Sequence, residues 1–269
     1  PGYNYARYLP GRLASIFAQT QPVTEVIVLD DASTDDSPMI AGRAAAAAGR
    51  EIRQSVNAEN SGSVFRQWRR GVEMARGAFV WIAEADDQAE PAMLATLAAR
   101  LSAAPDVVMA LCDSRSIDAE GGDIWPDYQD YYARNGGGAL ARDGLFPARD
   151  FARRFLAERN LILNVSAVLW RRSALLEALQ HCGAELDCYR MAGDWRLYLE
   201  LLGRTEGQVA WVARPLNIHR RHAASVTATL AAEAHLAEIS RAQAAATEIL
   251  DERSSFCEQK EAKKRSIPQ

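Results

Sequence analysis

The sequence predicts an α/β fold: a single domain built on a doubly wound, mostly parallel central sheet. One reason is that short apolar runs alternate with segments of helical periodicity over the first 112 residues. The other is that two of these runs, 26–29 and 78–83, are rich in β-branched or aromatic residues and continue into acidic clusters. Runs of that composition are typical of buried parallel strands, and open α/β sheets bind ligands at the carboxyl ends of their strands.

The first half of the chain divides into helices and strands that follow one another regularly. Apolar residues at helical spacing, capping side chains or an opening proline mark the expected helices, which are 7–19, 34–49, 64–76 and 91–103. Apolar runs of strand length lie between them and give the expected strands, which are 25–30, 51–56, 78–83 and 107–112.

The regular alternation stops after residue 113. Segment 123–138 is rich in Trp, Tyr, Asp and Gly without a clean period, which is typical of a binding loop or lid. Periodicity then predicts further helices at 151–158, 173–181, 194–202 and 228–250, and strands at 165–170 and 208–212. Segment 251–269 is highly charged and is expected to be a mobile tail.

Composition narrows the class of protein. The chain has 269 residues, of which 48% are apolar and 25% charged, which fits one globular domain or one domain with a tail. A net charge of −4 gives no general attraction to nucleic acid, so no nucleic-acid partner is expected. The four cysteines form no CxxC pair, which disfavours a zinc site. No signal peptide and no apolar stretch near the ~20 residues of a membrane span is visible, so the cytoplasm is the favoured compartment.

Acidic residues gather at two of the expected strand ends. Asp30 and Asp31 follow the first run, and Glu84, Asp86 and Asp87 follow the second. Several carboxylates in one cleft repel each other unless a cation or sugar hydroxyls satisfy them. The sequence therefore predicts a nucleotide site that holds a divalent metal ion.

An ordered set of motifs resembles one known family. The motifs are Pro1-Gly2-Tyr3-Asn4 and the segments 15–20, 28–37, 60–62, 71–77, 84–87, 193–195 and 220–222. In order and spacing they resemble the family 2 glycosyltransferases, whose A-type fold binds nucleotide sugars. The resemblance covers about residues 1–227. Segment 164–172, followed by Gly193-Asp194-Trp195, further resembles modules of large bacterial proteins that build surface polysaccharide.

The resemblance implies a Rossmann-like domain organisation. Residues 1–227 would form the A-type glycosyltransferase domain, with about 1–112 as the nucleotide-binding half and 113–227 as the acceptor-binding half. A C-terminal helix at 228–250 and the tail 251–269 would follow.

The chain departs from the family at its start. The apolar strand that normally precedes the Pro-x-Tyr-Asn turn is absent. Loss of an interior strand would leave two unpaired edges and a slot in the core. We therefore expect ~5 to 8 apolar residues, a typical strand length, to precede Pro1, and the chain to be a segment of a longer multidomain protein.

The resemblance implies roles in metal and nucleotide binding. Asp86 and Asp87 would hold Mn²⁺ or Mg²⁺ on the donor diphosphate, with Asp86 also contacting the ribose, although the acidic cluster could instead cap the helix opened by Pro91. His222 would reach the metal or the diphosphate, the alternative being a basic surface turn. The remaining nucleotide-binding residues would be Pro1, Tyr3, which stacks on the base, Asp31, which accepts its hydrogen bond, and Asn60.

The resemblance also places the catalytic base and the acceptor wall. Asp194 would take the proton from the acceptor hydroxyl, although the same residue could be a helix N-cap. Trp195 would be a core residue or a wall of the acceptor pocket. Trp125 and Tyr128 would form a lid that stacks on sugar, the alternative being a packed irregular loop.

Together these expectations define a reaction. The chain would be an inverting, metal-dependent glycosyltransferase that moves a sugar from a nucleoside diphosphate, UDP or dTDP being favoured, to a saccharide or lipid-linked acceptor in surface polysaccharide synthesis. Such an acceptor would bring the protein to the inner face of the membrane. Two alternatives stay open: a sugar nucleotidyltransferase, for which no glycine-rich basic loop is visible, and a non-catalytic binding module for nucleotide sugar or saccharide.

Overall fold

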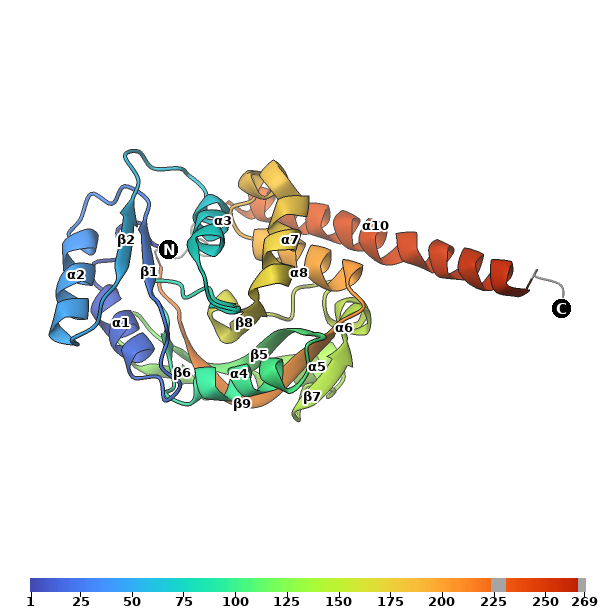
Figure 1. Ribbon diagram of the computed structural model, residues 1–269, viewed down its shortest axis with the longest axis horizontal. Helices are drawn as coiled ribbons and strands as arrows, with labels where there is room; N and C mark the ends of the chain where they lie inside the picture. Colours follow the sequence, from blue (N-terminus) through green and yellow to red (C-terminus); the bar gives the residue numbers. More distant parts are fainter. Residues whose placement is uncertain (224–230, 266–269) are drawn as a thin grey trace.

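The fold is a mixed α/β domain from which one long C-terminal helix projects (Figure 1). The computed structural model describes residues 1–223 and 231–265, with side chains up to Asp251. The strands are β1 (Ile27–Asp30), β2 (Arg53–Val56), β3 (Phe79–Trp81), β4 (Gln88–Ala89), β5 (Val107–Ile117), β6 (Asp123–Trp125), β7 (Gly144–Pro147), β8 (Val168–Arg171) and β9 (Gln208–Arg220).

Helices account for most of the remaining regular structure. They are α1 (Leu9–Phe17), α2 (Ser37–Ala47), α3 (Val64–Met74), α4 (Met93–Ala103), α5 (Gln129–Gly136), α6 (Ala148–Phe155), α7 (Arg172–Cys182), α8 (Gly193–Arg204) and α10 (Ala232–Arg265), with 3₁₀ turns η1 (Val165–Ala167) and η2 (Gly183–Cys188). Every helix and strand expected from the sequence has a counterpart among these. The short elements β4, β6, β7 and α5 were not expected.

The central sheet confirms the α/β class but corrects the expected strand direction. Its strands run in the order β3-β8-β5-β9-β4, with β6 added to β5 and β7 to β9. Among the described strands of this sheet only β5 and β9 pair in parallel; the other neighbours are antiparallel. The expectation of mostly parallel strands was wrong because an apolar run indicates burial, not direction. Short links such as 118–122 also return the chain as a hairpin.

The pairing of β4 with β9 brings together an acidic segment, 84–87, and a basic segment, 220–222, that lie far apart in the sequence. Gln88 lies opposite Ile218 in this antiparallel ladder. Because β4 starts directly after Asp87, the acidic cluster at the end of the β3 segment meets the residues that end β9. On the other side of β9, the parallel pairing with β5 places Ile117, at the end of β5, opposite Arg220. The register of three strands therefore assembles the polar centre described below.

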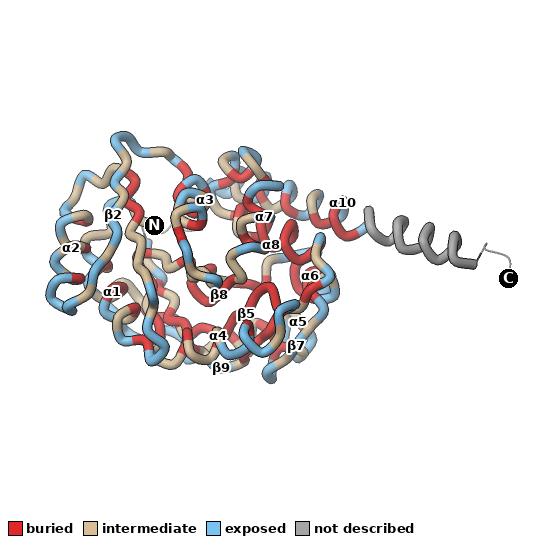
Figure 2. Tube along the Cα trace, viewed as in Figure 1, coloured by how far each residue is buried: buried red, intermediate tan, exposed pale blue. Residues whose placement is uncertain are grey.

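The core lies between the sheet and the helices on its faces (Figure 2). In the larger cluster, side chains of α3, α6, α7 and α8 pack onto β5, β8 and β9. The rings of Trp170 and Tyr198 stack with centroids 5.4 Å apart, and both side chains are fully buried. A second cluster packs α4 against the other side of β5, β8 and β9. Burial of this extent fixes the sheet and hence the strand ends that carry polar residues.

The C-terminal helix is longer than the sequence indicated. Residues 228–230 of the expected helix lie outside the described residues; α10 runs from Ala232 and continues through Arg265 rather than ending at Leu250. Its buried side chains, Ala242, Ala246 and Ile249 among them, belong to the core cluster that includes α8. The mobility of 251–269 stays a prediction. Within residues 1–223 and 231–265, no helix combines the length and apolar character that crossing a bilayer requires.

An apolar slot of about 650 Å³ lies between β1 and β3, beside Pro1. One edge of β1 pairs with β2. Among the described residues, the other edge is bonded only to Gly2. There the Gly2 N–H donates to the Leu29 carbonyl (2.9 Å), and the Asp31 N–H donates to the Gly2 carbonyl (3.0 Å). The slot therefore lies where the interior strand was expected. That residues precede Pro1 stays a prediction.

Candidate functional site

A polar cavity of about 1140 Å³ opens beside the residues that precede β4 and the ends of β6 and β9. Side chains from six segments line it, most of them acidic, basic or aromatic. They include Tyr5, Glu84, Asp86, Asp87, Trp125, Asp127, Tyr128, Asp130, Tyr131, Arg134, Asn164, Arg190, Met191, His219, Arg220, Arg221 and His222. The acidic residues Glu84, Asp86 and Asp87 thus share one cavity with the aromatic segment.

Asp86 and His222 are in direct contact at this cavity. The Nε2 atom of His222 lies 2.9 Å from Oδ2 of Asp86. The imidazole packs against the rings of Tyr8, with centroids 5.1 Å apart, and Tyr5, with centroids 6.3 Å apart. Burial, followed by repulsion from Asp87, raises the pKa of Asp86, and the hydrogen bond from His222 opposes that shift. The site therefore favours a positive charge beside the Asp86 carboxylate.

Asp87 is held by the protein on both carboxylate oxygens. The backbone N–H of Arg220 donates to Oδ1 (2.9 Å), and the Asn164 side-chain amide donates to Oδ2 (2.9 Å). Asp87 is only 2% exposed. The guanidinium of Arg220 in turn donates to the carbonyls of Asp86, Asp118 and Ala119. In this geometry Asp87 and Arg220 organise the strand ends, whereas Asp86 presents its carboxylate to the cavity.

The donor set can be tested against a divalent cation. Among the described residues, no cluster of three or more His, Cys, Asp or Glu side chains with metal-binding geometry is present. Asp86 and His222 supply one oxygen and one nitrogen ligand type, both accepted by Mn²⁺. Cations that act on nucleotide phosphates commonly take few protein ligands and complete their shell with phosphate and water. The two residues fit that kind of metal site.

Glu84 takes part in a neighbouring network rather than in the contact with His222. Its carboxylate accepts a hydrogen bond from Trp68 Nε1 (2.8 Å), and its backbone N–H donates to Ser166 Oγ (3.1 Å). Burial raises the pKa of Glu84 to about 7. Glu84 therefore ties the acidic segment to α3 and η1.

Asp194 lies in the first turn of α8, two residues after the N-cap Ala192. Its Oδ1 accepts the Trp195 N–H (2.6 Å), and the Asn160 amide donates to Oδ2 (3.2 Å). Burial raises the pKa of Asp194 to about 7, against the opposing effect of these hydrogen bonds. The N-cap of α8 is Ala192, so Asp194 is not the cap. The cavity is lined by Arg190 and Met191, and not by Asp194 itself.

The aromatic segment forms one side of the cavity. Trp125, which is 47% exposed, and Tyr128 meet edge to face with ring centroids 5.9 Å apart. The Tyr128 hydroxyl lies 3.0 Å from His219 Nδ1. The Arg221 guanidinium stacks over the Trp125 ring at 5.1 Å. Tyr128 is buried, so of these two rings it is Trp125 that offers an exposed apolar face suited to a sugar.

Asp31 and Asn60 lie in a separate hydrogen-bond network after β1. The Asp31 carboxylate accepts four hydrogen bonds. The donors are the Asn57 and Gln67 side-chain amides and the backbone N–H and hydroxyl of Ser61. Asn60 donates to the Asp31 carbonyl (2.9 Å). Neither residue lines the polar cavity. A base contact through Asp31 would have to replace one of these four bonds, since two carboxylate oxygens offer about four acceptor positions.

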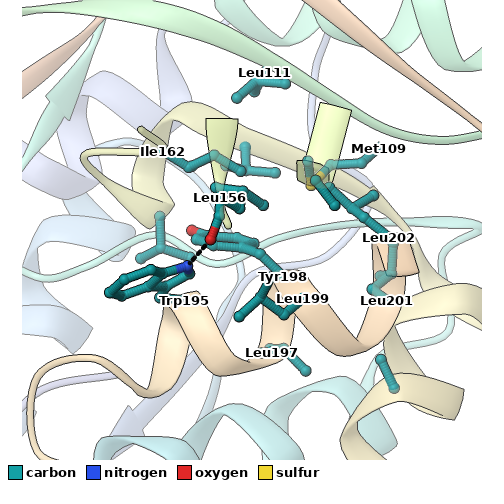
Figure 3. Packing of buried hydrophobic residues seen from close by; sticks show 14 of the residues in the cluster. Met109, Leu111, Leu156, Ile162, Trp195, Leu197, Tyr198, Leu199, Leu201 and Leu202 are labelled. Carbon is teal, nitrogen blue, oxygen red and sulfur yellow. Dashed lines mark hydrogen bonds between the residues drawn. The ribbon is translucent and has the colours of Figure 1, made fainter. Parts of the chain in front are cut away.

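Three further predicted site residues lie away from the polar cavity. Pro1 lines the apolar slot, and the Tyr3 side chain is 44% exposed at the surface. Trp195 lies in the core, where its Nε1–H donates to the Leu156 carbonyl (2.7 Å; Figure 3). This placement matches the core alternative for Trp195 rather than the acceptor wall.

Sequence reasoning missed Tyr5 and Asn164, both of which line the cavity. Tyr5 follows Tyr3 at a spacing of two, and the loop that carries both is fixed by backbone donation from Tyr5 to Ser37 Oγ (3.0 Å). Asn164 begins the segment that resembled polysaccharide-building modules, so its position was a signal that could have been read.

At one cavity the fold brings together an acidic strand end, a histidine that follows a distant strand, and aromatic side chains. The family model described as glycosyl transferase family 2 matches residues 1–163. The chain therefore belongs to glycosyl transferase family 2 and is a glycosyltransferase, as the sequence resemblance indicated.

Curated relatives match most of this chain but only part of their own length. An uncharacterised Mycobacterium tuberculosis protein is 27% identical over 227 residues, which is 82% of this chain and 57% of that protein. The O-antigen biosynthesis protein RfbC of Myxococcus xanthus is 30% identical over 240 residues, covering 78% of this chain and 18% of RfbC. The chain thus spans little more than half the length of the mycobacterial relatives.

Solved structures share the fold at low sequence identity. Staphylococcus aureus TarS 1–349 in complex with UDP superposes with a TM-score of 0.63 at 17% identity, over 94% of this chain and 68% of that one. Glucosyl-3-phosphoglycerate synthase from Mycobacterium tuberculosis, solved with Mn²⁺, UDP-glucose and phosphoglyceric acid, gives a TM-score of 0.54 at 16% identity, over 93% and 78% of the two chains. Both confirm the fold.

Proposed function

We propose that this glycosyltransferase is inverting and divalent-metal-dependent, and that it transfers a sugar from a UDP or dTDP donor to a saccharide or lipid-linked acceptor. The observation that carries the proposal is the 2.9 Å contact between Asp86 and His222 at the polar cavity. Burial disfavours the charged form of the Asp86 carboxylate, so a nearby cation would stabilise it. The His222 imidazole lies where it could bind the same cation.

Asp86 and His222 would hold Mn²⁺ or Mg²⁺ against the donor diphosphate. When bound, such an ion acts as a Lewis acid that stabilises charge on the departing nucleoside diphosphate. Asp87 is proposed as a residue of the same metal site, where its bonds to Arg220 and Asn164 fix the backbone next to Asp86. Asp86 remains the proposed ribose contact.

The similar structures support a nucleotide-sugar donor, but they do not decide between uridine and guanosine. TarS was solved with UDP and with UDP-GlcNAc, and glucosyl-3-phosphoglycerate synthase with Mn²⁺ and UDP-glucose. The mannosyltransferase PcManGT from Pyrobaculum calidifontis was solved with GDP-mannose and Mn²⁺. We favour UDP or dTDP because Asp31 and Tyr3 match the family residues that hold a pyrimidine. Pro1 and Asn60 stay proposed nucleotide-binding residues on the same ground.

Asp194 is the proposed general base. Inversion requires a carboxylate that removes the acceptor proton on the face opposite the departing diphosphate. A base is most effective when its pKa lies near the working pH, and burial raises the pKa of Asp194 to about 7. Because Arg190 and Met191 line the cavity and Asp194 does not, this role requires the wall to open or to shift when the acceptor binds.

The acceptor is proposed to be a growing saccharide or its lipid-linked form. Trp125 offers an exposed aromatic face at the cavity and Tyr128 packs against it, and the similarity to RfbC supports a role in surface polysaccharide synthesis. An acceptor with a lipid anchor would place the protein at the inner face of the membrane. We likewise propose 1–112 as the nucleotide-binding half and 113–227 as the acceptor-binding half.

The function is tested by a donor panel. UDP-glucose, UDP-GlcNAc, dTDP-glucose and GDP-mannose are each incubated with the protein and Mn²⁺, first in thermal-shift assays and then for release of nucleoside diphosphate. A ligand that binds only the native state raises the melting temperature. We expect a shift and slow donor hydrolysis with a uridine or thymidine donor. Binding without turnover of any donor in the presence of saccharide acceptors would overturn the enzymatic proposal in favour of a binding module.

A further inference from the structure

Glu238 stands out among the described side chains of α10 because it is buried, whereas Glu233 and Glu248 on the same helix are exposed. Its carboxylate accepts three hydrogen bonds from consecutive backbone N–H groups. Arg190 donates to Oε1 at 2.8 Å, and Met191 and Ala192 each donate to Oε2 at 2.9 Å. Three consecutive N–H groups directed at one carboxylate form an anion-binding concavity in the backbone.

Through this contact, a side chain of another helix binds the backbone directly before α8. Ala192 is the N-cap of α8 and has no side chain that could cap it. The positive end of a helix dipole stabilises a carboxylate placed there, and hydrogen bonds to a charged acceptor are stronger than neutral ones. Glu238 therefore binds, from α10, the three N–H groups that lead into α8, including that of its N-cap residue Ala192.

A second side chain of α10 holds the same loop. Arg241, three residues after Glu238, donates to the Cys188 carbonyl (3.2 Å), and its guanidinium lies over the Tyr189 ring at 4.6 Å. The helix itself is anchored elsewhere: Arg149 and Arg153 of α6 donate to the Leu250 carbonyl at 2.7 and 3.2 Å. Loop 188–192 is thus fixed by a helix that has its own attachment to the core.

The loop that Glu238 holds belongs to the candidate site. Arg190 and Met191 line the polar cavity, and Asp194 follows Ala192 by two residues. We propose that Glu238 is a positioning residue, which fixes the Arg190–Met191 wall and the first turn of α8 that carries Asp194. The importance of this position for catalysis rests on the proposed function. The clamp itself, which is the set of three hydrogen bonds from the backbone of residues 190–192 to Glu238, does not.

The clamp has a consequence that can be measured at Asp194. The groups that face this carboxyl are Asn160 and the Trp195 N–H, which hydrogen-bond it, together with Glu84 and Tyr198, which interact with it electrostatically. Without Glu238, three N–H groups lose their acceptor and the loop can open to water. Because burial is what raises the pKa of Asp194, entry of water lowers that pKa.

The test compares Glu238→Ala and Glu238→Gln with the matched control Glu248→Ala, an exposed glutamate on the same helix. Hydrogen exchange of the amides of residues 190–192 and carbon-13 titration of the Asp194 carboxyl are measured without any substrate. We expect exchange about tenfold faster and a lower pKa of Asp194 in Glu238→Ala, partial rescue in Glu238→Gln, and wild-type behaviour in the control. If the alanine variant does not fold, the glutamine variant carries the comparison.

Wild-type exchange and a wild-type pKa of Asp194 in the Glu238 variants would overturn the proposal. Donor binding and turnover separate the clamp from the proposed function. With Mn²⁺ and UDP as probe, the Glu238 variants should bind within about twofold of wild type, whereas hydrolysis of UDP-glucose or UDP-GlcNAc should fall. Absence of turnover in the wild-type protein with any donor would count against the proposed function, while the exchange and titration data would still decide the clamp.

Discussion

Nε2 of His222 lies 2.9 Å from Oδ2 of Asp86, although 136 residues separate the two in sequence. The contact depends on the antiparallel pairing of β4 with β9, which places the end of the acidic cluster against the end of the last strand. The acidic cluster alone is compatible with a helix cap. Its pairing with a histidine inside a polar cavity is what favours a metal-nucleotide site over a structural role.

His222→Ala should weaken the binding of UDP in the presence of Mn²⁺ by about tenfold or more, because the cation loses its nitrogen ligand. Binding measured in EDTA should be the same in the variant and the wild type. Titration calorimetry measures both. The control is His181→Ala, whose side chain is 55% exposed and lies outside the cavity. Equal losses in both variants would show that His222 has no specific role.

Asp194→Asn should keep the affinity for UDP and Mn²⁺ but lose sugar transfer or donor hydrolysis by at least ~10²-fold, the usual scale for a missing general base. The asparagine preserves size and can still hydrogen-bond with Asn160. Single-turnover kinetics at saturating donor isolate the chemical step. Wild-type turnover in this variant would remove Asp194 from the mechanism.

The raised pKa of Asp194 also predicts how stability depends on pH. An unfolded aspartic acid titrates near 3.9, whereas the folded group titrates at about 7, so between these values the native state binds the extra proton. The contribution of this group to stability is therefore present at low pH and is lost as pH rises toward 7. Asp194→Asn should gain in melting temperature relative to wild type between pH 5 and pH 8. A constant difference between the two proteins over that range would contradict a raised pKa.

The apolar slot gives a prediction about stability alone. Gly2 is bonded beside Leu29 and Asp31 with the parallel register Gly2↔Asp30, so residues placed ahead of Pro1 would run along the free edge of β1. Adding an apolar five-residue strand there should raise the melting temperature, since each buried large apolar side chain contributes ~1.5 to 3 kcal/mol. A Gly/Ser extension of equal length is the control. The same melting temperature for both extensions would mean that the slot does not accept a strand.

The helices and strands of the first half could be predicted from the sequence because their apolar periods are strong and their boundaries carry glycine, proline or capping residues. Strand direction could not be predicted, since the apolar run of β8 looks the same whether it pairs in parallel or, as it does with β5, antiparallel. The short β4 carries little apolar signal, yet its pairing positions the site.

Of the site residues expected from the sequence, Asp86, Asp87, Trp125, Tyr128 and His222 line the cavity, but their separate roles could not be predicted. Sequence treats Asp86 and Asp87 alike, and only the register of β9 shows that Asp87 is bonded to Arg220 while Asp86 meets His222. Glu238 gave no signal because a single glutamate in an alanine-rich helix is ordinary. Its role arises from where α10 packs, which depends on tertiary contacts that no local pattern records.

Calorimetric titration of UDP into the wild-type protein, once with Mn²⁺ and once with EDTA, tests the central claim most directly, because it measures whether the cation and the nucleotide bind as one unit at Asp86 and His222. The account predicts that Mn²⁺ strengthens the binding of UDP by at least about tenfold, and that Asp86→Asn removes this gain, as loss of a metal ligand should. Equal affinity for UDP with Mn²⁺ and with EDTA in the wild-type protein would contradict it.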